Sequence, residues 1–336
     1  KKKNINHIFT NLNLNLDLDG YENSDLNLKI EKVSNDTYLK IFDSNIYTDT
    51  LKPKNFNILK SEIILQLNSE KYNFETGFQS YENLTLSNND RYEYILPYYN
   101  YSKILSDNFM NGLISFASSG SNELKNTNNL RSKAVNDLSY NSLDLISKHG
   151  FKNNFNINFK NLISAGKNDS EYDSNPDLKI MSNLEFVTSL PMTKKNENFL
   201  NYLTPKVSFR FNPTDMKHYS SLEKKININN IFSNNRIGVD DTLETGESVT
   251  VGIDYKKQKL DDINKYFEMK LGTVFRNDEE NDIPKSSTLN KKNSNLFGSI
   301  SNNFSEYLKL DYNFSLDNDY KTFESNEVIA NLSVNN

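Results

Sequence analysis

Three histidines, His7, His149 and His218, are the side chains of this sequence best suited to proton transfer near neutral pH. They are far apart in the chain, and His149 precedes Gly150 in a stretch that we interpret as a solvated loop. Nucleophilic catalysis would need a serine held against one of them, and the sequence has no G-x-S-x-G elbow to present it. Because the 336 residues include no Cys, thiol catalysis, disulfides and Cys-ligated metal centres are excluded. We predict no catalytic residue, no cofactor and no metal site.

Two short acidic stretches, 278–282 and 317–319, could in principle hold Ca²⁺ through their carboxylates. Neither has the Gly-centred spacing of an EF-hand loop, so we interpret both as solvated loop charges. The chain also contains several Asn-x-Ser/Thr triplets. With 56 Asn residues in the chain, such triplets are expected by chance.

Residues 231–255 read IFSNNRIGVDDTLETGESVTVGIDY, and they join an irregular segment directly to a regular alternating one. Arg236, Asp240 and Asp241 are close enough in sequence to form an ion pair that fixes a loop over or inside the strand assembly, and a nearby wall carboxylate is the other partner that we expect for Arg236. An ordinary charged loop explains the same residues, and the residues alone leave both interpretations open.

The elements that would position these residues are β-strands, because apolar and polar residues alternate with period two along most of the chain. One face of the predicted strands carries Leu12, Leu14, Leu16, Phe155, Ile157, Phe159, Leu310, Tyr312 and Phe314. The opposite face carries Asn13, Asn15, Glu75, Asn156, Asn158, Arg210 and Asp311.

Strand length and number favour a membrane barrel over a soluble sandwich, which uses the same alternation. The runs 8–18, 72–81 and 306–317 match the 9–11 residues or so that a tilted strand needs to cross a bilayer. At about 20–24 residues per strand with its loop, the chain accommodates roughly 14–16 strands, and a sheet of that size is expected to close. The fold class predicted is therefore an all-β, antiparallel transmembrane barrel, with the apolar face toward lipid and the polar face toward a wet lumen.

Composition is compatible with that prediction and excludes other classes. Mean hydropathy is −0.71, as expected if only half of each strand must be apolar. The net charge of −5 argues against a nucleic-acid partner. The chain opens Lys1-Lys2-Lys3 without an initiator Met and stops within an alternating pattern. We interpret residues 1–336 as part of one barrel domain from a longer protein.

Several segments resemble the LptD family of outer-membrane lipopolysaccharide-assembly proteins. Residues 231–240, IFSNNRIGVD, followed by a strand at 248–255, resemble the family signature LFSGNRYSGLD and its following strand. Weaker matches occur in the family's order along the chain. They are 34–42, 92–103, 127–131, 203–213 and 294–301 with the strand 306–317.

The resemblance implies a large barrel in the outer membrane of a Gram-negative bacterium that releases lipopolysaccharide to the outer leaflet without catalysis. It also implies an LptE-like lipoprotein plug, an LptA-like periplasmic bridge reached through a missing N-terminal jellyroll, and contact with outer-membrane lipid. The first and last barrel strands are expected to be missing as well. The signature would form an ordered structural loop from Asn234, Asn235, Arg236, Gly238, Asp240 and Asp241.

This sequence departs from the family pattern at two points of the signature. The family's Gly-Asn-Arg is Asn234-Asn235-Arg236 here, and the Arg after its Asp is replaced by Asp241-Thr242. The inter-domain cysteines of the family have no counterpart in this stretch.

Three other functions stay open on the residues alone. A generic porin or plugged transporter would share the alternation but gives no reason for the 231–240 segment. A secreted Asn-rich β-solenoid or adhesin should show a fixed repeat period, and none is found. An outer-membrane hydrolase would need a convergent Ser/His/Asp or paired-carboxylate set, which the sequence does not reveal.

Overall fold

The computed structural model describes residues 6–42, 51–305 and 307–333. In them, 17 strands belong to one antiparallel sheet, and helices are limited to a few short turns. The strands of the first half are β1 (His7–Asn15), β2 (Asn23–Val33), β3 (Ile58–Asn68), β4 (Tyr72–Asn83), β5 (Tyr92–Ser106), β6 (Gly112–Lys125), β7 (Asn129–Ser142) and β8 (Leu145–Ile146). Those of the second half are β9 (Lys152–Lys167), β10 (Asp177–Ser189), β11 (Met192–Lys195), β12 (Phe199–Asn212), β13 (Gly246–Lys259), β14 (Tyr266–Arg276), β15 (Leu296–Asn303), β16 (Leu308–Leu316) and β17 (Phe323–Leu332). The helical turns are α1 (Tyr38–Phe42), η2 (Asn88–Arg91) and η3 (Lys285–Ser287). Among the described residues, no helix is long and apolar enough to cross a membrane.

The count of 17 strands exceeds the 14–16 expected from the sequence because two strands are interrupted. β10 and β11 pair with consecutive parts of the same partner, β12, and the break between them falls at Pro191. Proline has no N–H to give to a ladder, so it ends the regular pairing there. The two-residue strand β8 likewise pairs with the start of β9, which also pairs with β7. Each interruption adds one strand to the count, but it does not add another pass of the chain along the sheet.

Residue contacts divide the chain into two compact units. Unit 1 contains the residues up to 106, together with 115–138 and 161–179. Unit 2 contains 107–114, 139–160 and 180 onward. The division passes through β6, β7, β9 and β10, each of which contributes residues to both units.

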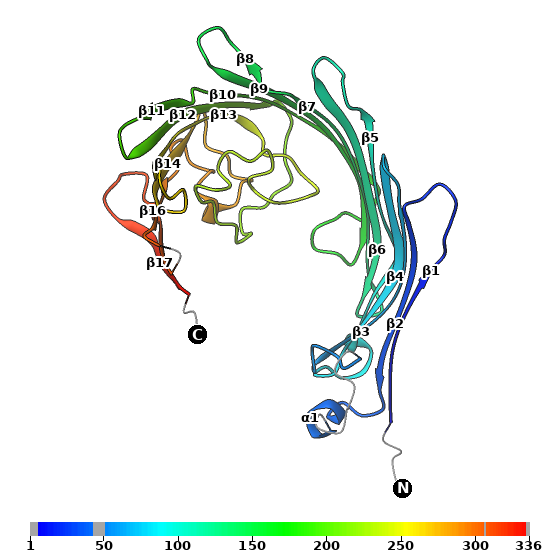
Figure 1. The fold of residues 1–336 in the computed structure, drawn as a ribbon. Coiled ribbons are helices and arrows are strands. Elements are labelled where there is room, and N and C mark those ends of the chain that lie inside the picture. The colour runs from blue at the N-terminus through cyan, green and yellow to red at the C-terminus, as the bar shows by residue number, and fades with distance from the viewer. Residues whose placement is uncertain (1–5, 43–50, 306, 334–336) are drawn as a thin grey trace. The chain divides into compact units, whose positions relative to one another are not determined.

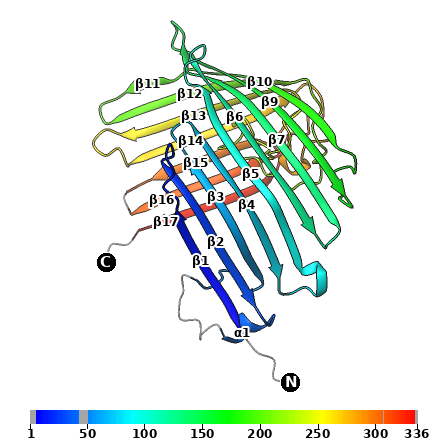
Figure 2. The same cartoon turned by 90° about the vertical axis from the view of Figure 1, so that its right-hand side faces the viewer.

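In unit 1, strands β1 to β5 run side by side in chain order (Figure 2). Their register aligns residues of one kind across the sheet. Leu14, Leu26 and Leu65 form one apolar row, and Gln66, Glu75 and Asn100 form a polar row on the opposite face. Because side chains alternate along every strand, the matched register keeps the two kinds of residue on separate faces.

In unit 2, strands β12 to β17 also pair in chain order. Two long loops, 213–245 and 277–295, lie against one side of this sheet (Figure 1). They share a small core in which loop residues such as Ile231, Ile283 and Leu289 pack on Val274 of β14 and Phe297 of β15. The loops are therefore packed onto the sheet through apolar contacts.

Candidate functional site

A row of charged and hydroxyl side chains crosses four strands of unit 2. The registers align Glu185 of β10 with Arg210 of β12, then with Ser248 of β13 and Arg276 of β14. All four residues are at most 7% exposed. Arg210 donates to Glu185 Oε1 at 3.0 Å, and the same carboxylate accepts from Ser208 Oγ at 2.8 Å and from Asn156 Nδ2 at 3.1 Å. The polar face of unit 2 is therefore cross-linked from strand to strand.

The 213–245 loop adds two residues to this row, Arg236 and Glu244. The Arg236 guanidinium binds the Glu244 carboxylate in a bidentate manner, with Nε donating to Oε2 at 2.6 Å and Nη2 donating to Oε1. Arg236 also donates to Ser248 Oγ and Thr250 Oγ1, both at 2.9 Å. Since Ser248 and Thr250 are wall residues of β13, these bonds anchor the loop to the sheet.

Glu244 is the centre of the charge cluster. Besides Arg236, it accepts from Arg210 Nη1 at 3.0 Å and from Arg276 Nη1 at 2.5 Å. Burial alone would raise the pKa of Glu244, but the three guanidinium groups, Arg236 foremost, outweigh burial and hold its pKa well below the ordinary value. The cluster unites three arginines with two glutamates. Its excess positive charge is shared with hydroxyl and carbonyl acceptors such as Ser233 O.

Of the partners predicted for Arg236, which were Asp240, Asp241 or a nearby wall carboxylate, the two aspartates are wrong. Arg236 pairs with Glu244, neither with Asp240 nor with Asp241. Asp241 instead accepts from Tyr219 Oη at 2.5 Å and from Lys217 Nζ at 3.2 Å. Asp240 has an exposed side chain, and its backbone carbonyl accepts from Lys160 Nζ at 2.5 Å. Arginine and glutamate eight residues apart meet because the segment between them folds into turns.

The other residues of the predicted loop motif have turn and docking contacts. Asn235 Oδ1 accepts from the Gly238 N–H at 3.0 Å, and Gly238 has a φ of +67°, the left-handed region that glycine tolerates best. Asn234 Oδ1 accepts from Asn183 Nδ2 of β10 at 3.1 Å. The segment is thus an ordered loop held both by its own turn and by strand side chains.

A depression formed by two glycines receives the aromatic residue of the loop. Gly252 of β13 is in register with Gly272 of β14, and a Cβ added at Gly252 would lie 2.7 Å from the Phe232 ring. Lys206, in register with Gly252 on β12, places its Nζ 4.5 Å from the centroid of the same ring. The loop therefore contacts the sheet in two ways. The Phe232 ring packs over the two glycines, and Arg236 forms an ion pair and hydrogen bonds beside the strand arginines.

The structure contains a Ser–His–Asp arrangement that sequence reasoning did not locate. Ser220 Oγ lies 2.7 Å from His218 Nε2, and His218 Nδ1 lies 2.6 Å from Asp282 Oδ1. The side chains of His218 and Asp282 are 66% and 42% exposed, so water competes for both and screens the charge that a buried acid would supply. The same two loops are also joined by backbone bonds, including Tyr219 N–H to Asp282 O at 2.8 Å. We interpret the arrangement as a clamp between the 213–245 and 277–295 loops.

The remaining predicted chemistry lies in separate places. His7 contacts Tyr38, and His149 is exposed in the loop before β9. In the acidic stretches, Asp278 pairs with Lys292, and Asp317 accepts hydrogen bonds from Thr322 and Lys321. Within the described ranges, no group of three or more His, Asp or Glu side chains is arranged to hold a metal ion.

The predicted wall residues lie on strands with contrasting exposure, except for Leu16, which directly follows the end of β1. On the apolar side, Leu12, Leu14, Leu16, Phe155 and Phe159 are exposed, whereas Ile157, Leu310, Tyr312 and Phe314 are half-buried. On the polar side, Asn158 and Arg210 are buried, Glu75, Asn156 and Asp311 are half-buried, and Asn13 and Asn15 on β1 are exposed. Exposed apolar side chains beside buried polar ones invert the usual pattern of a soluble protein.

Comparison with known protein families agrees with this arrangement. The family model described as LptD, LPS transport system D, matches residues 6–336. The chain belongs to the LptD family. No curated protein matches the sequence.

Membership of the LptD family confirms the resemblance seen in the sequence and assigns the fold to the LptD type of antiparallel β-barrel. The family transports lipopolysaccharide to the outer membrane and is a transport and assembly family. The Arg236 cluster thus joins a loop to the sheet in a member of a transport and assembly family. Glu185, Glu244 and Arg276, which complete it, were missed by sequence reasoning. The signal for Arg276 was its position on the polar side of a regular strand, in the same alternation that predicted Arg210.

Proposed function

We propose that this chain forms part of the wall of a non-catalytic translocon that inserts lipopolysaccharide into the outer leaflet of a Gram-negative outer membrane. The observation that carries the proposal is the inverted burial of neighbouring residues on one strand. On β12, Phe209 is 47% exposed and Arg210 is 3% exposed. A membrane wall requires this arrangement, since its apolar face contacts lipid tails and its polar face is hydrated or covered by polar protein.

The apolar side is proposed to be the lipid-facing surface. In unit 2 it carries the registered row Phe209, Val249 and Phe275, and in unit 1 the row Leu14, Leu26 and Leu65. Aromatic side chains gather near the strand ends of unit 1, where Tyr72, Tyr101 and Phe116 are ring neighbours. Such aromatic groups are typical of the membrane–water interface.

The polar side is proposed to line the lumen and to meet the partners of the translocon. These are an LptE-like lipoprotein plug and the saccharide part of lipopolysaccharide, delivered by an LptA-like bridge to a further N-terminal domain. Residues 1–336 are proposed to belong to one barrel domain. The 213–245 loop would occupy part of the lumen beside β12–β14 and hold a polar path in place.

A complementation experiment tests the proposal. A strain depleted of its own protein should lose newly made lipopolysaccharide from the cell surface, measured by modification of lipid A with an enzyme restricted to the outer leaflet. The full-length protein that contains this chain should restore the signal. Unchanged surface lipopolysaccharide after depletion would refute the proposed function.

Capture of the plug provides a second measurement. A photo-crosslinking residue at Asp311, on the polar side of β16, should capture a lipoprotein, whereas one at Leu310 should not. Equal capture at both positions would contradict the assignment of the faces.

A further inference from the structure

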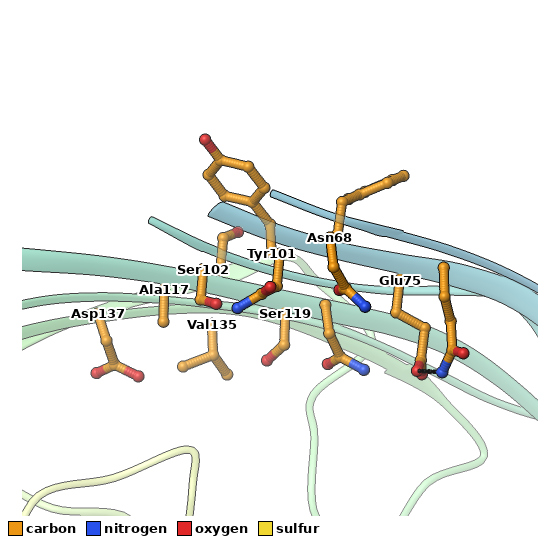
Figure 3. A pocket seen from close by; sticks show the side chains of 13 residues that line it. Asn68, Glu75, Tyr101, Ser102, Ala117, Ser119, Val135 and Asp137 are labelled. Carbon is orange, nitrogen blue, oxygen red and sulfur yellow. Dashed lines mark hydrogen bonds between the residues drawn. The ribbon is translucent and has the colours of Figure 1, made fainter. Parts of the chain in front are cut away.

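A pocket lies across strands β3 to β7 of unit 1, and most of its polar lining residues enter it from the polar face. It has a volume of about 360 Å³, within the range of roughly 300–1,000 Å³ typical of small-ligand sites. Figure 3 shows Glu75, Ser119, Val135 and Asp137 projecting to one side of the strands, with the Tyr101 ring projecting to the other.

Side chains without internal partners line this pocket. Asn68, Asn73, Asn100 and Ser102 line it, and none of their side chains makes a hydrogen bond to another residue that the structure describes. An amide offers two donors and an acceptor, and a hydroxyl offers one donor and two acceptor sites. This is the chemistry that recognises the hydroxyl groups of a sugar.

The charge of the pocket selects among saccharides. Its ionisable lining residues are Glu75 and Asp137, and no Lys, Arg or His lines it within the described part of the chain. Asp137 also interacts with another residue of the protein, so Glu75 is the carboxylate that we expect to meet a ligand. Glu75 accepts from Gln66 Nε2 at 2.8 Å, which leaves its charge in place. Phosphate groups are recognised by arginine and lysine and are repelled by carboxylates.

We propose that this pocket is a subsite for uncharged sugar units, and that it disfavours the phosphorylated part of the same glycolipid. The inference rests on the proposed function and adds that this part of the polar face distinguishes uncharged sugars from phosphorylated ones. The Tyr101 ring points away from the pocket (Figure 3), and Phe74, the other aromatic lining residue, is in register with Tyr101 on the same face of the sheet. Hydrogen bonds rather than ring stacking then select the ligand, and weak contact is suited to cargo that must move on.

The test uses the purified full-length protein with a photo-crosslinking residue at position 100. Its probes are lipopolysaccharide with neutral outer sugars and lipopolysaccharide truncated to the phosphorylated inner core. The expected result is a yield about tenfold higher with the long form, a ratio that one to two hydrogen bonds supply. The matched control at position 101, on the opposite face, should show no preference. Labelling by free polysaccharide cleaved from the lipid would support the same sugar chemistry.

Two variants make the result specific to charge. Glu75→Lys should increase labelling by the truncated, phosphorylated form, and Glu75→Gln, which removes the charge and keeps the size of the side chain, should have a smaller effect in the same direction. Equal labelling at positions 100 and 101, or stronger labelling at 100 by the truncated form in the unaltered protein, would overturn the proposal. If position 156 on the polar face labels lipopolysaccharide while position 100 does not, only the subsite fails. If no position labels it, the proposed function fails.

Discussion

At the scale of single residues, Arg236 differs from most surface arginines because its side chain is 1% exposed and all its hydrogen bonds lie within the protein. Removing one member of a buried ion pair leaves the other charge without compensation in a poorly solvated place. In this cluster Glu244 would keep Arg210 and Arg276 but lose its bidentate partner, and the loop would lose its anchor to β13.

We therefore expect Arg236→Ala to destabilise the folded protein by at most about 3–5 kcal/mol, the cost of leaving a buried charge wholly uncompensated, because Arg210 and Arg276 still bind Glu244. The measurement is the urea midpoint followed by heat-modifiable electrophoresis of the folded barrel. Lys225→Ala, an exposed lysine of the same loop, is the matched control and should leave the midpoint unchanged. Equal midpoints for the two variants would show that the Arg236 pair contributes nothing.

The depressed pKa of Glu244 gives a pH dependence of definite sign. When pH falls below about 4.3, the ordinary glutamate value, the unfolded chain takes up a proton that the folded protein does not. Stability should therefore decrease as pH falls, with a slope of at most about 1.4 kcal/mol per pH unit from this group. Glu244→Gln should reduce the slope between pH 5 and about pH 3. A stability that rises on acidification would contradict the assignment.

Ser220 should be chemically inert despite its bond to His218. A structural clamp predicts that a fluorophosphonate probe labels Ser220 no more than the neighbouring Ser221, as measured by mass spectrometry of tryptic peptides. Selective labelling of Ser220, lost in His218→Ala, would instead establish an activated nucleophile.

At the scale of elements, the 213–245 loop depends on the glycine depression of β13 and β14. A methyl group at position 252 would lie 2.7–2.8 Å from two atoms of the Phe232 ring, closer than carbon atoms approach without strain. The loop and the added side chain cannot occupy the same place.

Gly252→Ala should therefore loosen the loop and raise its rate of cleavage in limited proteolysis several-fold. Adding Phe232→Ala should remove the clash and restore part of the protection. Gly20→Ala is the control for a strained glycine substitution outside the loop, since Gly20 has a φ of +88° but a Cβ there meets nothing within 4 Å. If Gly252→Ala and Gly20→Ala are cleaved alike within the loop, ring docking is not what orders it.

At the scale of the whole molecule, the two faces of the sheet should respond differently to the same charge. Ile63 of β3 is 39% exposed on the apolar side, and Gln66 of the same strand lies on the polar side. Ile63→Arg should reduce the stability of the inserted protein by roughly 2–4 kcal/mol if the residue lies near the bilayer midplane. Gln66→Arg should cost far less. Refolding into lipid vesicles with a urea titration measures both, and equal costs would contradict a lipid-facing apolar side.

The sequence by itself determined the strands and their two faces. Period-two alternation is local, since each backbone unit turns the next side chain to the opposite side of the strand, so Leu12 to Leu16 and Phe155 to Phe159 could be assigned without long-range information. The ordered family segments also indicated the LptD fold, which the family match then established.

Only the tertiary structure decided which side chains of the loop and wall meet. Arg236 had two aspartates within five residues, yet turns at 227–238 direct it to Glu244, while Lys217 and Tyr219 take Asp241. The row Glu185, Arg210, Ser248 and Arg276 depends on the register of four strands, two of which, β12 and β13, are separated by the 213–245 loop. A buried charge takes the partner that best compensates its lost hydration, and that choice is set by the whole packed arrangement rather than by sequence distance.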